Sequence, residues 1–340
     1  MRGHALRPAG LAGAAVGLTT SVVLLIAGCA LIGVAAAGGG GAVVAIMIAV
    51  LLIAIACAYG DRLALSAMLA RPVSEVEHPE LYRLVRELSK AGRLPVPRLY
   101  LSPAGQPNSF AVGRGPRTAS ICCTEGLLRV LDEAELRGVL GHELAHVSGR
   151  DILASSVSAG LATVITFPAG LARLARPASA GPGSAGLGSA GLGSASGSAG
   201  AGSAGPGSAS GSAGGDGAPA AFGAGSGGSG LGLLETLLML VLGPLAALVV
   251  RLAVPQEREY RADAAGALLS GDPVALASAL RKIDAGTAEL ALAPDGRRIT
   301  VGHLMIASPF RLEGFARLFL THPPAGERVR RLEALAGYRR

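Results

Sequence analysis

The pattern of apolar and polar positions divides the chain into long uncharged runs and polar stretches. Two uncharged runs lie near the N-terminus, over residues 11–37 and 42–59, and four glycines separate them. Each run approaches or exceeds the roughly 20 apolar residues that a helix needs to cross a bilayer. We therefore predict a transmembrane helical hairpin over residues 1–72.

Basic residues lie on both sides of this predicted hairpin, and by the positive-inside rule they put both of its ends in the cytoplasm. They are Arg2 and Arg7 before it and Arg62 and Arg71 after it. A second interpretation is an exported lipoprotein, because the stretch ending at Cys29 resembles a lipoprotein processing site. The residues after Cys29 stay apolar, which disfavours that interpretation.

In residues 73–151, apolar and polar positions alternate as they do in a water-soluble domain. Leu81, Leu84 and Leu88 recur at helical spacing, and Gly92 ends the predicted helix. Short β-prone runs follow at 98–102, 109–112 and 118–123, which predicts a small sheet with a hairpin. A capping box then opens another helix, since Asp132 is followed three residues later by Glu135.

Two more apolar runs, 152–172 and 231–250, lie in a predicted membrane region over residues 152–254. Between them, residues 177–230 are almost wholly Gly, Ser, Ala and Pro, a composition that predicts a disordered linker. Polar sequence resumes over 255–340, which we assign as the second part of the soluble domain. The expected fold is mainly α with a small β-sheet, combined with about four transmembrane helices.

Composition agrees with a membrane protein. Half of the 340 residues are hydrophobic, only 16% are charged, and the mean hydropathy is +0.50. The net charge of +7 comes from scattered basic residues without interleaved aromatics, so we expect no nucleic-acid partner. The four cysteines form no disulfide framework, since two lie in apolar runs and two are adjacent on a predicted strand.

The candidate chemistry lies in His142-Glu143-Leu144-Ala145-His146. Two histidines four residues apart share one face of a helix and can bind one zinc ion, and the glutamate can act as general base when water attacks a peptide carbonyl. A catalytic zinc needs a third protein ligand, for which Glu259 is the candidate. From spacing alone, a solvated helix with Arg258 and Arg261 as ion-pair partners explains Glu259 equally well.

Four motifs in order give the chain a family resemblance. They are 107–113, the His142 helix with Asp151, 259–263, and 321–324 with the sequence Thr-His-Pro-Pro. In these motifs the chain resembles the HtpX-like membrane zinc endopeptidases, relatives of the CAAX prenyl endopeptidases. The resemblance implies a zincin-type peptidase domain with one Zn²⁺ per chain.

The resemblance also implies a role for each matching residue. His142, His146 and Glu259 would bind zinc, and Glu143 would be the general base. Residues expected to support the ligands or to lie near the substrate are Asp151, Asp263, His322 and Asn108.

These expectations combine into a membrane-embedded endopeptidase in the cell membrane with its active site facing the cytoplasm. Its substrates would be proteins, chiefly membrane proteins, in a role of quality control. An edge strand beside the metal-binding helix can receive a substrate backbone by strand addition, although the strands can equally serve only to pack the domain. Two other functions stay open, a catalytically silent membrane scaffold and an exported lipoprotein with an extracytoplasmic peptidase domain.

Overall fold

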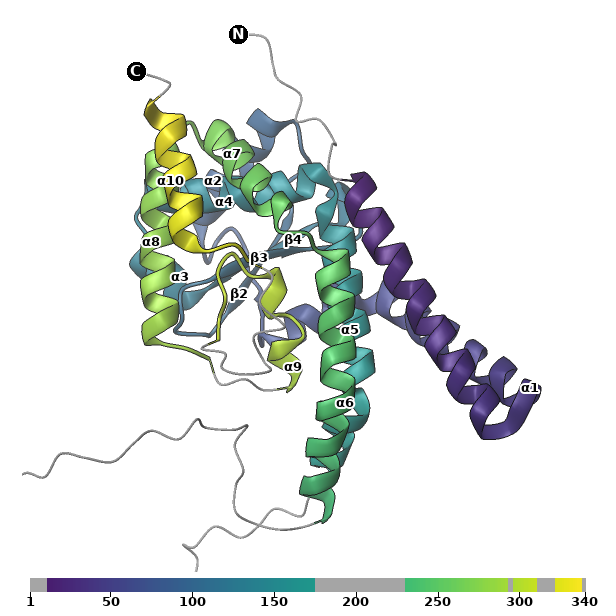
Figure 1. Ribbon diagram of the computed structural model, residues 1–340. Helices are drawn as coiled ribbons and strands as arrows, with labels where there is room; N and C mark the ends of the chain where they lie inside the picture. Colours follow the sequence, from purple (N-terminus) through teal and green to yellow (C-terminus); the bar gives the residue numbers. More distant parts are fainter. Residues whose placement is uncertain (1–10, 175–229, 293–295, 311–321, 338–340) are drawn as a thin grey trace, which may run out of the picture.

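The computed structural model describes residues 11–174, 230–292, 296–310 and 322–337. The predicted linker therefore lies outside the described residues except for Gly230, and so does Thr321 of the C-terminal motif. Within the described ranges the fold is mainly helical with a small sheet, as predicted (Figure 1).

The first half of the chain carries the sheet and the helix with the His142-Glu143-Leu144-Ala145-His146 motif. Its elements are α1 (Leu11–Ala67), β1 (Arg71–Pro72), α2 (Pro79–Gly92), β2 (Arg98–Ser102), β3 (Ser109–Val112), η1 (Pro116–Thr118), β4 (Ser120–Thr124), α3 (Glu125–Val130), α4 (Glu133–Gly149) and α5 (Asp151–Leu174). The second half is helical in the part that the structure describes. Its elements are α6 (Gly230–Ala253), α7 (Glu257–Ser270), α8 (Pro273–Glu289), α9 (Gly296–Ile299), η2 (Gly302–Leu304) and α10 (Ala325–Gly337).

The four strands form one sheet in the order β1-β2-β4-β3, so β3 lies at an edge. β3 and β4 pair antiparallel as the predicted hairpin, whereas β2 and β4 pair parallel. The last strand begins at Ser120 rather than at Thr118, because Pro116 starts a short 3₁₀ turn there. The two-residue strand β1 was not predicted.

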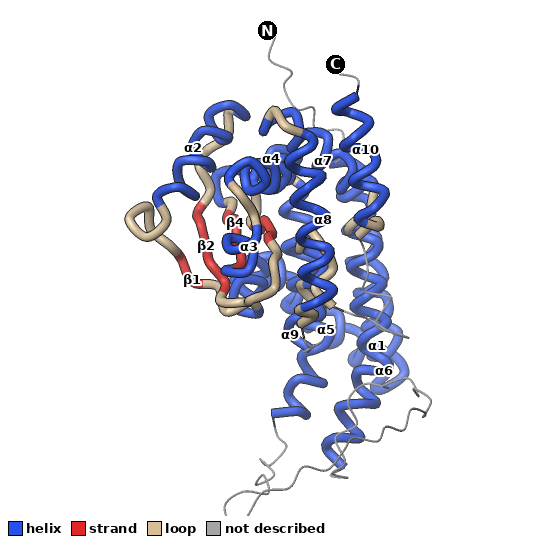
Figure 2. Tube along the Cα trace, turned by 90° about the vertical axis from the view of Figure 1, so that its left-hand side faces the viewer, coloured by secondary structure: helices blue, strands red, loops and turns tan. Residues whose placement is uncertain are grey.

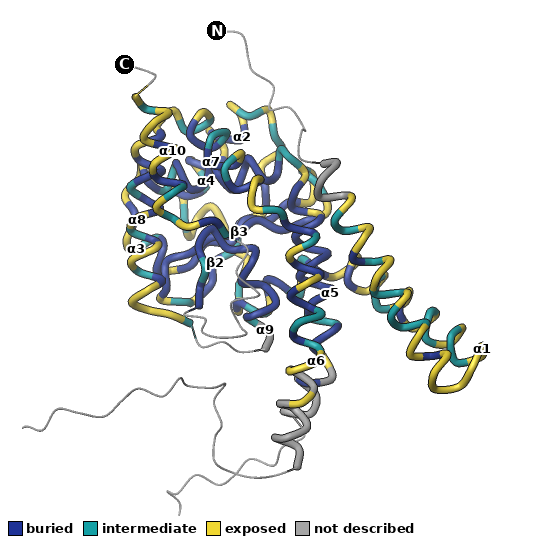
Figure 3. The backbone as a smooth tube through the Cα atoms, viewed as in Figure 1, coloured by how far each residue is buried: buried dark blue, intermediate teal, exposed yellow. Residues whose placement is uncertain are grey.

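Alternate residues of β3 and β4 face two different cores. Ile121 and Cys123 pack with α2, α4, α8 and α10 in the larger core. Phe110, Val112 and Cys122 face the end of α1, α5 and residues 301–305. The adjacent cysteines thus point to opposite faces as expected, and helices enclose the sheet on both sides (Figures 2 and 3).

Helix α1 is a hairpin of two arms, as predicted, because the backbone breaks at Ala37 and Gly38. Gly38 has φ of +62°, a left-handed conformation that glycine adopts without steric cost. Both arms extend away from the rest of the protein in Figure 1. Large apolar side chains cover their surface, with Leu31 72% and Ile32 71% exposed.

The expected four membrane spans are not confirmed. Among the described residues, only the 52-residue stretch of α1 from Val16 to Ala67 is a single helix long and apolar enough to cross a bilayer. A second candidate is the pair Leu240–Ala253 and Glu257–Ser270, which is bent by 48°. The apolar part of α5 is shorter, Asp151–Phe167, and it packs against α1 and α6.

Candidate metal centre

Helix α4, which carries the two predicted histidine ligands, begins at the predicted capping box. Oδ1 of Asp132 accepts a hydrogen bond from the Glu135 backbone N–H at 2.9 Å, and the Asp132 N–H donates to Oε2 of Glu135 at 3.0 Å. These bonds satisfy two backbone donors at the helix start. The helix then places His142 and His146 one turn apart on the same face.

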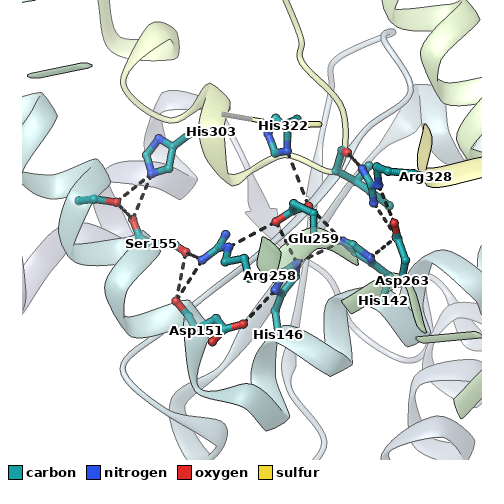
Figure 4. A network of polar contacts seen from close by, with 12 residues as sticks. His142, His146, Asp151, Ser155, Arg258, Glu259, Asp263, His303, His322 and Arg328 are labelled. Carbon is teal, nitrogen blue, oxygen red and sulfur yellow. Dashed lines mark hydrogen bonds and ion pairs between the residues drawn. The ribbon is translucent and has the colours of Figure 1, made fainter. Parts of the chain in front are cut away.

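Three side chains converge on one point between α4 and α7. Nε2 of His142 lies 3.2 Å from Nε2 of His146. The Glu259 carboxylate approaches both, with Oε2 3.7 Å from His142 Nε2 and Oε1 3.6 Å from His146 Nε2. The structure therefore brings the three predicted ligands together (Figure 4).

Two glycines let α4 and α7 approach closely enough for this convergence. A Cβ atom added to Gly141 would lie 2.8 Å from the Gly266 carbonyl oxygen, and one added to Gly266 would lie 2.6 Å from the His142 backbone nitrogen. Real Cβ atoms do not come that near to backbone. The helices are thus in backbone contact beside the ligands.

Each histidine has a carboxylate behind its other ring nitrogen. Nδ1 of His142 lies 2.9 Å from Oδ1 of Asp263, and Nδ1 of His146 lies 3.6 Å from Oδ2 of Asp151. Such partners fix the orientation and tautomer of a metal-ligating imidazole. The sequence left the choice between Asp151 and Asp263 open, and the structure puts both next to a ligand.

Two buried arginines, neither among the residues predicted for the site, compensate these acidic groups. Arg328 binds both carboxylate oxygens of Asp263. Nε of Arg258 lies 3.3 Å from Oε1 of Glu259, and its Nη1 donates to the hydroxyl of Ser155. Arg258 had been interpreted as a solvated ion-pair partner, yet it is only 4% exposed.

The arginines and histidines also lower the pKa values of the carboxyl groups. Burial alone would raise the pKa of Glu259, but His146, His322 and Arg258 hold it well below its usual value. Burial likewise opposes ionisation of Asp263, and the Arg328 guanidinium lowers its pKa to about 2. Both carboxylates are thus charged at neutral pH, as metal ligation and imidazole orientation require.

The remaining predicted residue of the HExxH motif, Glu143, contacts the edge strand. Oγ of Ser109 donates a hydrogen bond to Oε1 of Glu143 at 2.6 Å, and Glu143 is 1% exposed. Asn108, the residue before Ser109, uses its amide to bind the backbone of Ala307. Ser109 carried no signal in the sequence beyond its position in a β-prone run.

Of the other two histidines near the site, one touches the ligand group. Nδ1 of His322 lies 3.7 Å from Oε2 of Glu259, and neither ring nitrogen has a hydrogen-bond partner in the described part of the chain. His303 instead lies behind Arg258, with its Nε2 3.0 Å from Oγ of Ser158. Burial lowers the pKa of His303 to about 3, so it is neutral.

The donor set fits zinc. Two imidazole nitrogens and one carboxylate are the usual protein ligands of a catalytic zinc, with a fourth position left for water. Donors bound tetrahedrally at about 2.1 Å lie about 3.4 Å from one another. The two imidazole nitrogens are 3.2 Å apart, close to that value, and each lies within 3.7 Å of one oxygen of the Glu259 carboxylate.

Known proteins are similar in sequence to this chain over most of its length. The model of peptidase family M48 matches residues 75–336. A protein named Protease HtpX homolog from Kineococcus radiotolerans is 48% identical over 278 residues, which are 82% of this chain and 80% of that protein. Proteins of the same name are 43% identical over 292 residues in Paenarthrobacter aurescens, covering 82% of each chain, and 35% identical over 278 residues in Thermococcus kodakarensis, covering 82% and 81%.

Proposed function

Because the chain belongs to peptidase family M48 and is a metalloendopeptidase, we propose that His142, His146 and Glu259 bind its catalytic zinc ion. The observation that carries this proposal is the convergence of their donor atoms, all within 4.8 Å of one another. Asp263 and Asp151 would orient the two imidazoles from behind. The catalytically silent scaffold is disfavoured, because Glu143 is retained beside the ligands.

Glu143 is proposed as the general base. When bound, zinc would lower the pKa of a water towards neutrality and withdraw electrons from a peptide carbonyl. Glu143 accepts the proton of the attacking water and passes it to the leaving amine nitrogen. The Ser109 hydroxyl holds one oxygen of Glu143, which leaves the other oxygen available for this transfer.

His322 and Asn108 are proposed as residues on the substrate side. Since both ring nitrogens of His322 lack a hydrogen-bond partner in the described chain, the ring can donate to the oxygen of a substrate carbonyl. Asn108 immediately precedes the edge strand β3, so its amide can bind a peptide backbone that adds to this edge. A substrate strand would add to this edge.

We propose that the enzyme is embedded in the cell membrane. The exposed apolar surface of α1 supports this location, because a water-soluble protein rarely exposes so much contiguous apolar surface. The domains would then be a membrane hairpin over 1–72, peptidase parts over 73–151 and 255–340, and a membrane region over 152–254. A cytoplasmic active site near the bilayer suits cleavage of membrane proteins in quality control.

Replacement of the base tests the proposed function. Glu143→Gln removes proton acceptance while keeping the size of the side chain, so casein cleavage is expected to fall by about a hundredfold or more. Zinc content, measured on the purified full chain, is expected to stay at one ion per chain. A Glu143→Gln enzyme that cleaves casein at the wild-type rate with zinc bound would refute the mechanism.

A further inference from the structure

The candidate site is closed in this structure. His142 and Glu143 are each 1% exposed and Glu259 is 2% exposed, so a peptide could not reach them. The edge of β3, where a substrate strand would add, is covered by residues 305–307. We call these three residues the covering segment.

The covering segment pairs with β3 through the backbone of Ile306. The Ile306 N–H donates to the Ser109 carbonyl oxygen at 2.9 Å. The Ile306 carbonyl oxygen accepts a hydrogen bond from Nη1 of Arg328 at 2.6 Å. Both backbone groups of one residue are therefore satisfied by residues of the candidate site.

Asn108 holds the next residue in the same way. Its Nδ2 donates to the Ala307 carbonyl oxygen at 2.9 Å, and its Oδ1 lies 3.4 Å from the Ala307 nitrogen. A side-chain amide that pairs with both the N–H and the C=O of one residue imitates a neighbouring strand. Met305 is also extended, with φ of −73° and ψ of 153°.

These contacts connect the covering segment to two parts of the candidate site, the proposed general base and the carboxylate behind His142. Ser109, which binds the Ile306 N–H, also donates to Glu143. Arg328, which binds the Ile306 carbonyl, also holds Asp263 behind His142. The backbone of Ile306 is therefore held by two residues that also contact Glu143 and the carboxylate behind His142.

We infer that the covering segment is an internal stand-in for a substrate strand, and that a substrate places a branched aliphatic residue where Ile306 lies and a small residue where Ala307 lies. This inference rests on the proposed function. The Ile306 side chain is 1% exposed within the larger core, so its site accepts an aliphatic group and excludes a charged one. The peptide bond cut would be the one that precedes the substrate residue at the position of Ile306. The nitrogen of that bond would lie beside Ser109, which also contacts the proposed base Glu143.

Cleavage then requires the covering segment to leave the edge of β3. A ligand that binds only the open form has its apparent affinity reduced by the fraction of molecules that are open. Weakening the covering segment should therefore strengthen binding of a peptide at the same edge. Ile306→Ala removes the buried side chain and keeps both backbone hydrogen bonds.

A peptide of residues 302–310, Gly-His-Leu-Met-Ile-Ala-Ser-Pro-Phe, is the probe. Its binding is measured by fluorescence anisotropy on the full chain carrying Glu143→Gln, both with zinc and metal-free. With Ile306→Ala added, we expect binding to be tighter by about tenfold or more, because the three buried side-chain carbons that are removed no longer stabilise the closed form. The matched control is Ile283→Ala. It removes the same side chain from a fully buried position on α8 in the same core, away from the covering segment.

Two results would overturn the inference: unchanged affinity in Ile306→Ala, or an equal gain in Ile283→Ala. A peptide with Asp at the position of Ile306 is expected not to bind. A second measurement needs no variant, since the cut sites of wild-type enzyme in casein are expected to precede an aliphatic residue followed by a small one. Casein cuts without that preference, if still dependent on Glu143, would refute only this inference, whereas cleavage independent of Glu143 would refute the proposed function.

Discussion

The Arg328 guanidinium holds both carboxylate oxygens of Asp263, with Nε 2.8 Å from Oδ2 and Nη2 2.7 Å from Oδ1. The two residues come from α10 and α7 and are 2% and 3% exposed. Asp263 in turn contacts His142, so the C-terminal helix is connected to the metal ligands through one ion pair.

Removing the cation of this pair is expected to destabilise the fold. Arg328→Met leaves a buried carboxylate without its partner, which typically costs about 3–5 kcal/mol. The free energy of unfolding, measured with denaturant, reports the loss. Arg330→Met is the control on the same helix, because Arg330 is 73% exposed and its ion pair should contribute less than about 1 kcal/mol. Equal losses in the two variants would contradict the assignment.

Removing the anion at the same place is expected to weaken metal binding. Asp263→Asn loses the charge that orients His142, and losses of this kind reduce metal affinity by roughly 10- to 100-fold. Competition with a chelator measures the affinity. Asp284→Asn, an exposed change on α8, should leave it unaltered. Wild-type affinity in Asp263→Asn would show that the contact does not support the ligand.

The third ligand can be identified by comparing two glutamates on α7. Glu259→Ala is expected to abolish zinc retention and cleavage, because the carboxylate that faces both histidines is lost. Glu257→Ala should do little, since Glu257 is exposed two residues away and points elsewhere. Metal analysis of both purified variants decides between them. Full zinc occupancy in Glu259→Ala would overturn the assignment.

The loss of fold stability at acid pH should depend on Glu135, which lies away from the proposed metal ligands. Burial would raise the pKa of Glu135, but hydrogen bonds from Lys282, Ser278 and the Asp132 N–H lower it overall. A carboxyl group whose folded pKa is lowered stabilises the fold above its unfolded pKa, about 4.3, and that contribution is lost as the pH falls through the folded pKa.

Glu135→Gln is therefore expected to lower the melting temperature at pH 6, with a difference from wild type that shrinks below about pH 4. Thermal unfolding of the full chain across this pH range measures the difference. Glu80→Gln, an exposed change at the start of α2, is the control. A constant difference from pH 6 to pH 3 would mean that Glu135 does not contribute through its charge.

Topology is the remaining prediction. Four spans with both termini in the cytoplasm would protect the peptidase domain from protease added to intact spheroplasts, because Arg117 in η1 would face inside. Reporter fusions at both termini give an independent measurement. Cutting near Arg117 would contradict this topology, and acyl labelling at Cys29 would instead support the exported lipoprotein.

Local patterns predicted much of the fold and the inner part of the site. The capping box at Asp132, the hairpin of β3 and β4 and the facing pair His142 and His146 each depend on residues close in sequence. Short-range spacing determines such features, because turns, caps and helix faces involve neighbours. These are the features that the structure reproduces.

Contacts between distant segments could not be predicted in this way. Arg328 belongs to none of the predicted motifs, yet it is buried against Asp263, 65 positions earlier. Ile306 belongs to no motif, and only the packing of residues 305–307 along β3 gives it a role. Glu259 was ambiguous for the same reason. The sequence of a charged helix looks the same whether its glutamate faces water or lies beside the histidines of another helix.

The backbone contact between Gly141 and Gly266 offers a way to resolve that ambiguity from sequence. Gly266 follows Glu259 by seven residues, so the missing side chain and the acid share one helix face two turns apart. In a helix that faces water, glycine at that position would only lower helix stability, by up to about 1 kcal/mol. Two sequence features would therefore distinguish a ligand-bearing helix from a solvated one. They are a glycine seven residues after the glutamate and a glycine directly before the first histidine.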